Sequence, residues 1–309
     1  MARPLLHALR ASLPNAVVTA VGRPASRLLD RERLWNDWKP WPEARTLLKR
    51  EPTFDSAVVL PPSFSSAWSL PRGIRVRSGF AGEWRSWLLT HPWRRPPRGD
   101  LHLSQEYLRL GEPVLARALS SPLQRVPRLA PSAAETEGAR RTARAALGER
   151  AYVVLGPGAA YGPAKRWPVE RFMALGRRCV ERGLGVLVCG AANDRAEAEA
   201  VAGEIGAHAR SLAGTTSTEE QLALCAGAAG TICNDSGLAH LAAATGAPTV
   251  VIFGSTSSAW TAPLGPRVAI AQRAPVCSPC FQRTCAIGYR CLTAVEVADA
   301  LRAWESLAA

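Results

Sequence analysis

The sequence predicts an α/β chain with a doubly wound parallel sheet. In its second half, short apolar runs of strand type alternate with segments of helical periodicity, an order that is typical of parallel sheets. Helix-end signals agree with this pattern, because Ser217–Glu220 has the sequence of a capping box and Gly183 and Gly246 follow predicted helices. The length of 309 residues is long for one core and suits two domains.

The first half holds fewer regular elements than the second. The leucines in Leu5–Leu9 are spaced as on one helix face. The predicted order is a helix around these leucines, buried strands at 16–21 and 56–60, a loop-rich insertion at 71–99 with a short strand at 74–76, and a helix at 101–118. A Ser- and Pro-rich linker at 119–135 follows, so we expect one domain at 1–132 and another at 133–309.

The second half alternates strands and helices more cleanly. Strands are expected at 151–155, 185–189, 229–233 and 248–253. Helices are expected at 133–147, 168–182, 193–205, 218–228, 236–245 and 293–307. Ligands of such sheets bind beyond the carboxyl ends of the strands. The turns at 156–165, 190–194 and 234–240 all lie at those ends, so we expect them to converge on one crevice.

The turn after the strand at 229–233 is suited to bind an anion. Asp235 can cap the helix that follows, while the N–H groups of Ser236 and Gly237 face outward at its N-terminus. His240 lies on the first helical turn and can donate to a phosphate or a sugar. The alternative is a well-capped helix with a packed histidine.

The turn after the strand at 151–155 carries Lys165, the only lysine of the second half. A lysine at this place can neutralise a diphosphate as charge builds on a leaving group, and the alternative is a solvated loop lysine. Asp194, in the third turn, can bond a ribose hydroxyl, although helix capping explains it equally well. Two anion-binding turns in one α/β unit suggest a site for a nucleotide diphosphate.

The charge of the chain is concentrated in its first half. Of the formal net charge of +13, residues 1–150 carry +12, and seven of the ten Trp lie there too. A basic surface with interleaved aromatic side chains suits a polyanion, such as nucleic acid, a phosphorylated glycolipid or an anionic membrane face. A coding bias toward Arg is the alternative source of the charge, since 35 of the 38 basic residues are Arg, but it does not explain the asymmetry.

The cysteines divide into a quartet and four scattered residues. The quartet is Cys277, Cys280, Cys285 and Cys291. Its close spacing suggests a structural zinc rather than disulfides, with free thiols as the alternative. The scattered four, expected to be core thiols, are Cys179, Cys189, Cys225 and Cys233. No apolar run approaches the roughly 18 residues of a membrane span and no secretory signal is visible, so we expect a cytoplasmic protein.

Several of these motifs together resemble a known family. They are Gly158–Pro168, Leu212–Thr215, Asn234–His240 and Cys277–Cys280, with looser matches at Leu60–Ser65 and Arg77–Glu83. Through these motifs, the chain resembles the bacterial ADP-heptose:lipopolysaccharide heptosyltransferases of glycosyltransferase family 9, in particular those of type II. The resemblance covers the second half almost continuously.

The resemblance implies a fold of the GT-B type, with two Rossmann-like domains facing a central cleft. The second domain would hold ADP-heptose, and the first would hold the phosphorylated inner core of lipopolysaccharide, with its Kdo, heptose and lipid A, at the cytoplasmic face of the inner membrane. Such enzymes invert the anomeric centre without a catalytic metal. Lys165 would meet the diphosphate as the catalytic cation. The substrate-binding residues would be Ala159, Ala160, Lys165, Asp194, Asp235, Ser236, Gly237 and His240.

The first residues depart from the family pattern. Family members begin with a buried strand and a Gly-Asp turn that carries the proposed base, whereas this sequence begins inside the helix that follows, at Met1–Arg10. We therefore expect an incomplete N-terminal domain and assign the base to no residue. A start codon placed too late is one explanation, and a truncated, inactive chain is the other.

Three other functions fit parts of the sequence. A catalytically inactive nucleotide-sugar-binding protein would keep the anion-binding turns and lack turnover. A nucleic-acid-binding protein is suggested by the basic charge and the Trp content, but no motif of that class appears, so we expect no nucleic acid as partner. A Rossmann dehydrogenase is disfavoured, because no Gly-x-Gly-x-x-Gly follows a strand.

Overall fold

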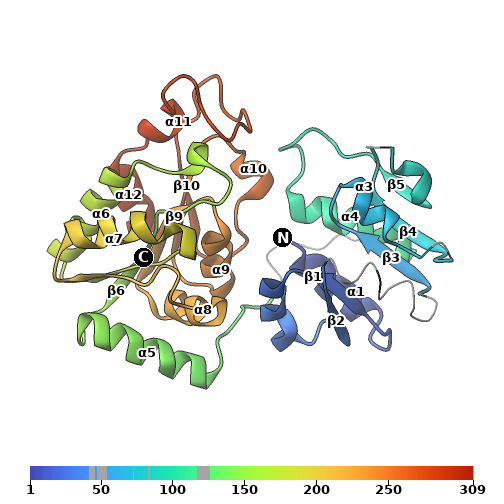
Figure 1. The fold of residues 1–309 in the computed structure, drawn as a ribbon, viewed down its shortest axis with the longest axis horizontal. Helices are drawn as coiled ribbons and strands as arrows, with labels where there is room; N and C mark the ends of the chain where they lie inside the picture. The colour runs from blue at the N-terminus through green and yellow to red at the C-terminus, as the bar shows by residue number, and fades with distance from the viewer. Residues whose placement is uncertain (42–45, 47–53, 72, 83, 117–125, 309) are drawn as a thin grey trace. The chain divides into compact units, whose positions relative to one another are not determined.

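The computed structural model describes residues 1–41, 46, 54–71, 73–82, 84–116 and 126–308. The chain divides into two compact units, Met1–Val126 and Pro127–Ala309 (Figure 1). The break falls inside the linker that we predicted at 119–135, whose first part lies outside the described residues.

The second unit is built on one sheet of six parallel strands in the order β11-β10-β9-β6-β7-β8. The strands are β6 (Tyr152–Gly156), β7 (Gly185–Val188), β8 (Ala209–Ser211), β9 (Gly230–Asn234), β10 (Thr249–Phe253) and β11 (Val268–Gln272). The predicted parallel sheet is therefore confirmed. The two edge strands, β8 and β11, were not predicted, because β8 has only three residues and includes Arg210.

Helices cover both faces of this sheet. Buried side chains of α6 (Val169–Glu181), α7 (Arg195–Ile205) and α12 (Val297–Ala308) pack on one face. Those of α5 (Ala133–Leu147), α8 (Thr218–Gly227) and α9 (Gly237–Thr245) pack on the other. The sheet is apolar on both sides for this reason, as parallel sheets are. The predicted capping box is present, since Ser217 Oγ accepts the N–H of Glu220 and the Glu220 carboxylate accepts that of Ser217.

The four scattered cysteines lie in this core, as predicted. All of them are buried. Removal from water disfavours a thiolate, so burial raises the pKa of Cys179 to about 11 and that of Cys225 to about 12, and it raises the pKa values of Cys189 and Cys233 as well. These thiols are therefore protonated packing groups at neutral pH.

The first unit contains two smaller parallel sheets. They are β1 (Thr19–Gly22) with β2 (Asp37–Pro40), and β3 (Ser56–Val59) with β4 (Val76–Phe80) and β5 (His91–Trp93). Its helical segments are α1 (Arg3–Ser12), η1 (Pro24–Glu32), α3 (Phe64–Trp68), η2 (Ser86–Leu88) and α4 (Leu103–Leu115). The opening helix and the strand at 56–60 were predicted, while β2 and β5 were not.

The predicted strand at 16–21 is wrong in extent and in burial. It forms only from Thr19, where pairing with β2 begins, and Val17 is 80% exposed. Val17 precedes the residues that pair with β2, so the sheet does not cover its side chain. The strand expected at 74–76 likewise begins late, at Val76, and continues to Phe80.

A buried carboxylate joins α1 to η1 in this unit. Glu32 lies 2.6 Å from an Arg3 guanidinium nitrogen and 3.0 Å from His7 Nε2. Burial raises the pKa of Glu32, but the hydrogen bonds from His7 and Arg3 outweigh it and lower the pKa to about 2. The folded state therefore favours the ionised form.

We expect Glu32→Gln to lower the free energy of unfolding at pH 7 by about 2 kcal/mol. Because the folded pKa lies below the unfolded one, this contribution is present above pH 4.5 and is lost as the pH falls toward 2. Urea unfolding of both proteins between pH 7 and pH 3 measures the difference. Glu112→Gln, at the more exposed ion pair with Arg109, serves as the control and is expected to cost less than about 0.5 kcal/mol. If the difference in unfolding free energy between the two proteins did not become smaller at pH 3, Glu32 would not have the lowered pKa.

Candidate nucleotide-binding site

The centre of the six-stranded sheet is the point where its strand order reverses. β6 and β9 are neighbours there, with Leu155 beside Ile232 and Gly156 beside Cys233. From β6 the chain continues to β7 and β8 on one side, and from β9 to β10 and β11 on the other. Ligands of doubly wound sheets bind at such a point. The turns that follow β6 and β9 thus start side by side, as the sequence predicted.

Asn234, the last residue of β9, ties these two turns together. Its side chain is fully buried; its amide nitrogen donates to Pro157 O at 2.5 Å and its amide oxygen accepts the N–H of Trp167 at 3.0 Å. Both partners belong to the segment between β6 and α6. One side chain therefore satisfies two buried backbone groups of the opposite turn.

Lys165 and Asp235 form an ion pair across the two turns. Lys165 lies in the one-turn helix η4 (Pro163–Lys165), and its Nζ is 2.5 Å from Asp235 Oδ2. The same oxygen accepts a hydrogen bond from Thr256 Oγ1 at 2.7 Å. The lysine side chain is 13% exposed and that of the aspartate 3%. Lys165 is therefore not the solvated loop lysine that was the alternative interpretation.

This ion pair corrects the role predicted for Asp235 as a helix cap. The N-cap of α9 is Ser236, in an extended conformation, and no side chain makes a capping hydrogen bond there. The carboxylate of Asp235 is directed to Lys165 and Thr256, because a buried charge gains more from a cationic partner than from an amide. Gly237, at the first position of α9, is exposed, and a Cβ added there would meet no atom within 4 Å.

Asp194 closes the third turn. It ends the one-turn helix η5 (Ala192–Asp194), where its Oδ2 accepts the N–H of Ala191 at 3.0 Å, and its Oδ1 accepts from Arg166 at 3.2 Å. A Cβ on Gly158 would lie 2.2 Å from its Cγ, so the first turn needs glycine to admit this carboxyl group. Turn capping, one of the two roles considered for Asp194, is what the side chain performs. A ribose contact stays a prediction.

Arg166 bridges Asp194 and the nearby Glu197. Its second guanidinium nitrogen lies 2.7 Å from a Glu197 carboxylate oxygen. Burial nevertheless raises the pKa of Glu197, because the loss of hydration exceeds the stabilisation by Arg166. Arg166, which follows Lys165, therefore links the turn after β6 to the turn that contains Asp194.

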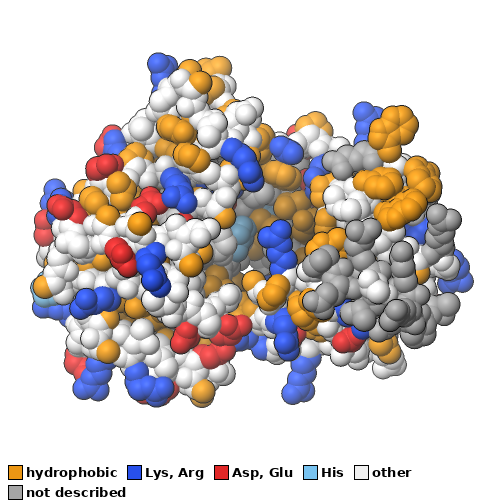
Figure 2. Space-filling view, viewed as in Figure 1, with side chains coloured by type: hydrophobic (Ala, Val, Ile, Leu, Met, Phe, Trp, Pro, Cys, Tyr) orange, Lys and Arg blue, Asp and Glu red, His pale blue; other side chains and the backbone are white. Residues whose placement is uncertain are grey.

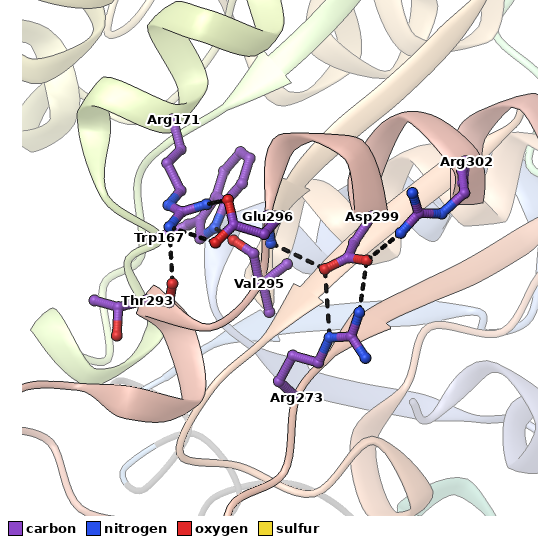
Figure 3. Close-up of polar contacts among 8 residues, drawn as sticks. All are labelled: Trp167, Arg171, Arg273, Thr293, Val295, Glu296, Asp299 and Arg302. Carbon is purple, nitrogen blue, oxygen red and sulfur yellow. Dashed lines mark hydrogen bonds and ion pairs between the residues drawn. The ribbon is translucent and has the colours of Figure 1, made fainter.

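The start of α6 is anchored to the C-terminal segment (Figure 3). The Trp167 indole, 1% exposed, donates to Val295 O at 2.9 Å. One turn later, Arg171 donates to Thr293 O at 2.9 Å and pairs with Glu296. Asp299, which accepts the N–H of Glu296 at 3.0 Å, closes the N-terminus of α12. The turn that bears Lys165 is therefore held from two sides, by Asn234 and by the segment before α12.

The segment with the cysteine quartet lies against the turn after β6. The N–H of Ala164 donates to Arg283 O at 3.0 Å, and the Tyr161 hydroxyl donates to Phe281 O at 2.5 Å. Gly162 has φ of 144°, and a Cβ there would stand 2.8 Å from Arg283 O. The close approach of the two backbones requires glycine at this position.

The four thiols of the quartet differ in exposure. Cys277 and Cys280 are exposed, Cys285 is half-buried with its Sγ accepting the N–H of Tyr289 at 3.4 Å, and Cys291 is buried. Burial raises the pKa of Cys291, and its three neighbours raise it further. Within the described parts of the chain, no three His, Cys, Asp or Glu side chains are gathered closely enough to hold a metal ion. Zinc at this quartet stays a prediction.

The remaining predicted site residues lie on the same two turns. Ala159 is buried and its carbonyl accepts from Arg166 at 3.4 Å, while Ala160 is exposed. Ser236 and His240 are half-buried at the start of α9. Sequence reasoning missed Asn234 and Thr256 as site residues. The position of Asn234 at the end of a predicted buried strand was a usable signal, whereas nothing in the sequence near Thr256 pointed to Asp235.

Comparisons with known proteins agree on one group of enzymes. The profile of the family described as "Glycosyltransferase family 9 (heptosyltransferase)" matches residues 44–289. Lipooligosaccharide heptosyltransferase 2 of Haemophilus influenzae is 32% identical over 227 residues, which cover 70% of this chain and 65% of that protein, slightly less than two thirds. Lipopolysaccharide heptosyltransferase 2 of Escherichia coli is 30% identical over 289 residues, which cover 85% of this chain and 81% of that protein.

The same likeness appears in three dimensions. The solved structure of Escherichia coli ADP-heptose lps heptosyltransferase II superposes with a TM-score of 0.83 at 28% identity, covering 99% of this chain and 94% of that one. This likeness and the parallel sheets confirm the predicted α/β fold of the GT-B type.

Proposed function

The chain belongs to glycosyltransferase family 9, and from this premise we propose that it transfers heptose from ADP-heptose to the inner core of lipopolysaccharide. The observation that supports the proposal is the ion pair between Lys165 and Asp235, which joins the two turns predicted to bind anions at the reversal point of the sheet. A nucleotide sugar, whose diphosphate joins a ribose to a second sugar, is the kind of ligand that such a site can bind.

The donor would bind along the two turns. The backbone N–H groups of Ser236 and Gly237 stand at the positive end of α9, where a phosphate group is stabilised by hydrogen bonds and by the helix dipole. Lys165 adds an ammonium group with three N–H donors, so it can bind a phosphate oxygen while it keeps its bond to Asp235. Ala159 and Ala160 would line the same phosphates, Asp194 would face the ribose, and His240 would reach the phosphate or the sugar.

The proposed reaction inverts the anomeric carbon of the heptose. A hydroxyl group of the acceptor attacks that carbon while a carboxylate base takes the hydroxyl proton. The bond from the carbon to the β-phosphate oxygen breaks, and ADP leaves with the electron pair. Lys165 stabilises the charge that develops on this oxygen, which is the role that a metal ion has in other transferases.

The acceptor half of the proposal rests on charge. Residues 1–126 carry 20 basic and 10 acidic residues, a formal net charge of +10. A phosphorylated acceptor that contains Kdo, heptose and lipid A is a polyanion and is attracted to such a unit. Lipid A is membrane-bound, so we infer that the protein works in the cytoplasm as a peripheral protein of the inner membrane. Among the described residues, no helix combines the length and the apolar character that a bilayer span needs.

A transfer assay tests the function. The purified chain is incubated with ADP-heptose and heptose-deficient lipopolysaccharide, and released ADP and the mass of the glycolipid are followed. We expect one added heptose per acceptor. ADP binding by calorimetry without any transfer would instead identify an inactive nucleotide-sugar-binding protein, and a folded chain that neither binds nor transfers would reject the donor site too.

The cysteine quartet is a separate structural proposal. Four thiolates leave no open coordination position, so a zinc ion held by Cys277, Cys280, Cys285 and Cys291 would fix the segment that lies against the turn after β6. Metal analysis of the purified chain is expected to give about one zinc per molecule, lost on Cys280→Ser. Less than about 0.2 zinc per molecule would favour free thiols. Cys225→Ser, in the core, is the control that keeps the metal.

A further inference from the structure

Three aromatic side chains of the first unit form an exposed cluster, and a fourth exposed ring, that of Trp84, follows in the segment before Trp87. This aromatic patch consists of Phe64 and Trp68 of α3, Trp84, and Trp87 of η2. Their exposed fractions are 37%, 41%, 90% and 64%. Figure 2 shows large hydrophobic side chains gathered over α3 and β5, with Lys or Arg side chains at the edge. Such a group of large apolar residues on a surface marks a place of contact.

Three of the four rings of the aromatic patch lie against each other. Phe64 and Trp68 are stacked with ring centroids 5.7 Å apart, and Trp68 meets Trp87 edge to face at 6.1 Å. Two residues that are 19 positions apart in the sequence, Trp68 and Trp87, therefore contribute to one continuous surface. Isolated exposed aromatic residues would not do this.

A buried arginine holds the two segments of the patch in place. Arg85 lies between the two exposed tryptophans in sequence and is itself fully buried. Its guanidinium donates to Pro61 O at 2.6 Å and to Ser63 O at 3.1 Å, at the start of α3. The segment of Trp84 and Trp87 is thus fastened beneath the patch to the segment of Phe64. The rings are presented by a fixed framework.

Trp84 occupies a backbone position that favours glycine. Its φ is 58°, in the left-handed region, where a bulky side chain is strained. Its ring is nevertheless almost wholly in solvent. Neither the backbone geometry nor side-chain packing favours a tryptophan at this position, whereas contact of its ring with a partner surface would.

The sequence around the aromatic patch is rich in arginine. Between residues 61 and 98 the sequence has seven Arg and one acidic residue, Glu83. Arg75, Arg94 and Arg98 are exposed, whereas Arg85 is buried and Arg77 donates to backbone carbonyls, among them Leu88 O at 2.7 Å. Tryptophan favours the interface between headgroups and acyl chains, because its ring is both apolar and a hydrogen-bond donor. Arginine near that interface is attracted by anionic headgroups.

We propose that the aromatic patch docks the protein on an anionic bilayer, with Trp84 and Trp87 entering the interface and the nearby arginines pairing with phosphate headgroups. This rests on the proposed function, in which the acceptor is a membrane lipid. The short helical segments α3 and η2 carry most of these rings. Arg85 links the two segments through its hydrogen bonds to Pro61 O and Ser63 O.

Vesicle binding tests the docking surface without any sugar transfer. The full chain is mixed with phosphatidylcholine vesicles with or without phosphatidylglycerol, and the bound fraction is measured by sedimentation. We expect binding that requires phosphatidylglycerol and falls with salt. The double variant Trp84→Ser/Trp87→Ser is expected to bind about 100-fold more weakly, about tenfold for each ring removed from the interface.

Two further variants keep the result interpretable. Trp84→Gly relieves the left-handed backbone, so it cannot unfold the chain through strain, and it should still weaken vesicle binding about tenfold. Trp41→Ala removes an exposed tryptophan of the same unit outside the patch and should bind as the unchanged protein does. Equal binding of all variants, or equal binding to neutral vesicles, would overturn the proposal. The proposal would also be overturned if the patch variants bound an oligonucleotide more weakly but bound vesicles as the unchanged protein does. That result would identify the patch as a nucleic-acid-binding surface.

Heptose transfer separates this inference from the proposed function. The patch variants should keep transfer to a detergent-free, water-soluble core fragment and lose it with acceptor embedded in vesicles. Vesicle binding by a chain that transfers no heptose would contradict the function alone. Transfer with patch variants that bind vesicles normally would contradict the docking surface alone.

Discussion

Replacing Lys165 with alanine is expected to lower kcat/KM for ADP-heptose by about 100- to 1,000-fold. The Lys165 ammonium group joins the turns after β6 and β9 through its 2.5 Å contact with Asp235, and in the proposed function both turns bind the phosphates. Without it, the charge on departing ADP loses its cationic partner, and the buried Asp235 carboxylate repels that charge. Steady-state kinetics and ADP calorimetry measure the effect.

A second variant separates chemistry from folding in this prediction. Lys165→Ala leaves Asp235 without its cationic partner and should cost about 2 kcal/mol of unfolding free energy. Adding Asp235→Asn removes the orphaned charge, so stability should return while kcat/KM stays low. Lys39→Ala, at the ion pair with Asp37 in the other unit, should leave ADP affinity unchanged. If Lys165→Ala retained normal kinetics, Lys165 would have no place in the donor site.

Replacing Asn234 with alanine should be the most damaging single change to the architecture of the site. It would leave the Trp167 N–H and the Pro157 carbonyl buried without a partner, at a cost of about 4 kcal/mol in unfolding free energy. The turn that bears Lys165 would also lose its link to β9. We therefore expect ADP binding to fall below detection even where the protein is folded, as measured by urea unfolding and calorimetry.

Asn193 provides the matched control for this change. It is an asparagine in the neighbouring η5 turn, but its side chain is exposed. Asn193→Ala should change the unfolding free energy by less than about 0.5 kcal/mol and leave ADP binding intact. Similar losses in both variants would mean that Asn234 has no special linking role.

The second unit could be predicted from its sequence because its signals are local and mutually consistent. Each strand is a short apolar run, and capping residues such as Ser217 and Gly246 mark where helices begin and end. The site followed from the rule that turns after parallel strands share one edge. The edge strands escaped prediction because they are short or only half-buried, so their pattern is weak.

The contacts within the site could not be predicted in the same way. Whether Asp235 caps its own helix or pairs with Lys165 depends on the position of a turn about 70 residues away, which no local pattern encodes. In the first unit, strand formation depends on partners rather than on β-propensity, as Val17 illustrates with 80% of its surface in water. Tertiary context decides such cases.

The contact between Lys165 and Asp235 also bears on how the enzyme would finish a catalytic cycle. If the ammonium group had no other anionic partner, the departure of ADP would leave it unpaired in a largely buried site. This would be unfavourable, so ADP would be released slowly. Here a permanent anionic neighbour is already present, with Thr256 keeping it oriented. When ADP leaves, the Lys165 ammonium group keeps its ion pair with Asp235. The lysine can therefore stabilise the leaving group in the reaction without slowing the release of ADP.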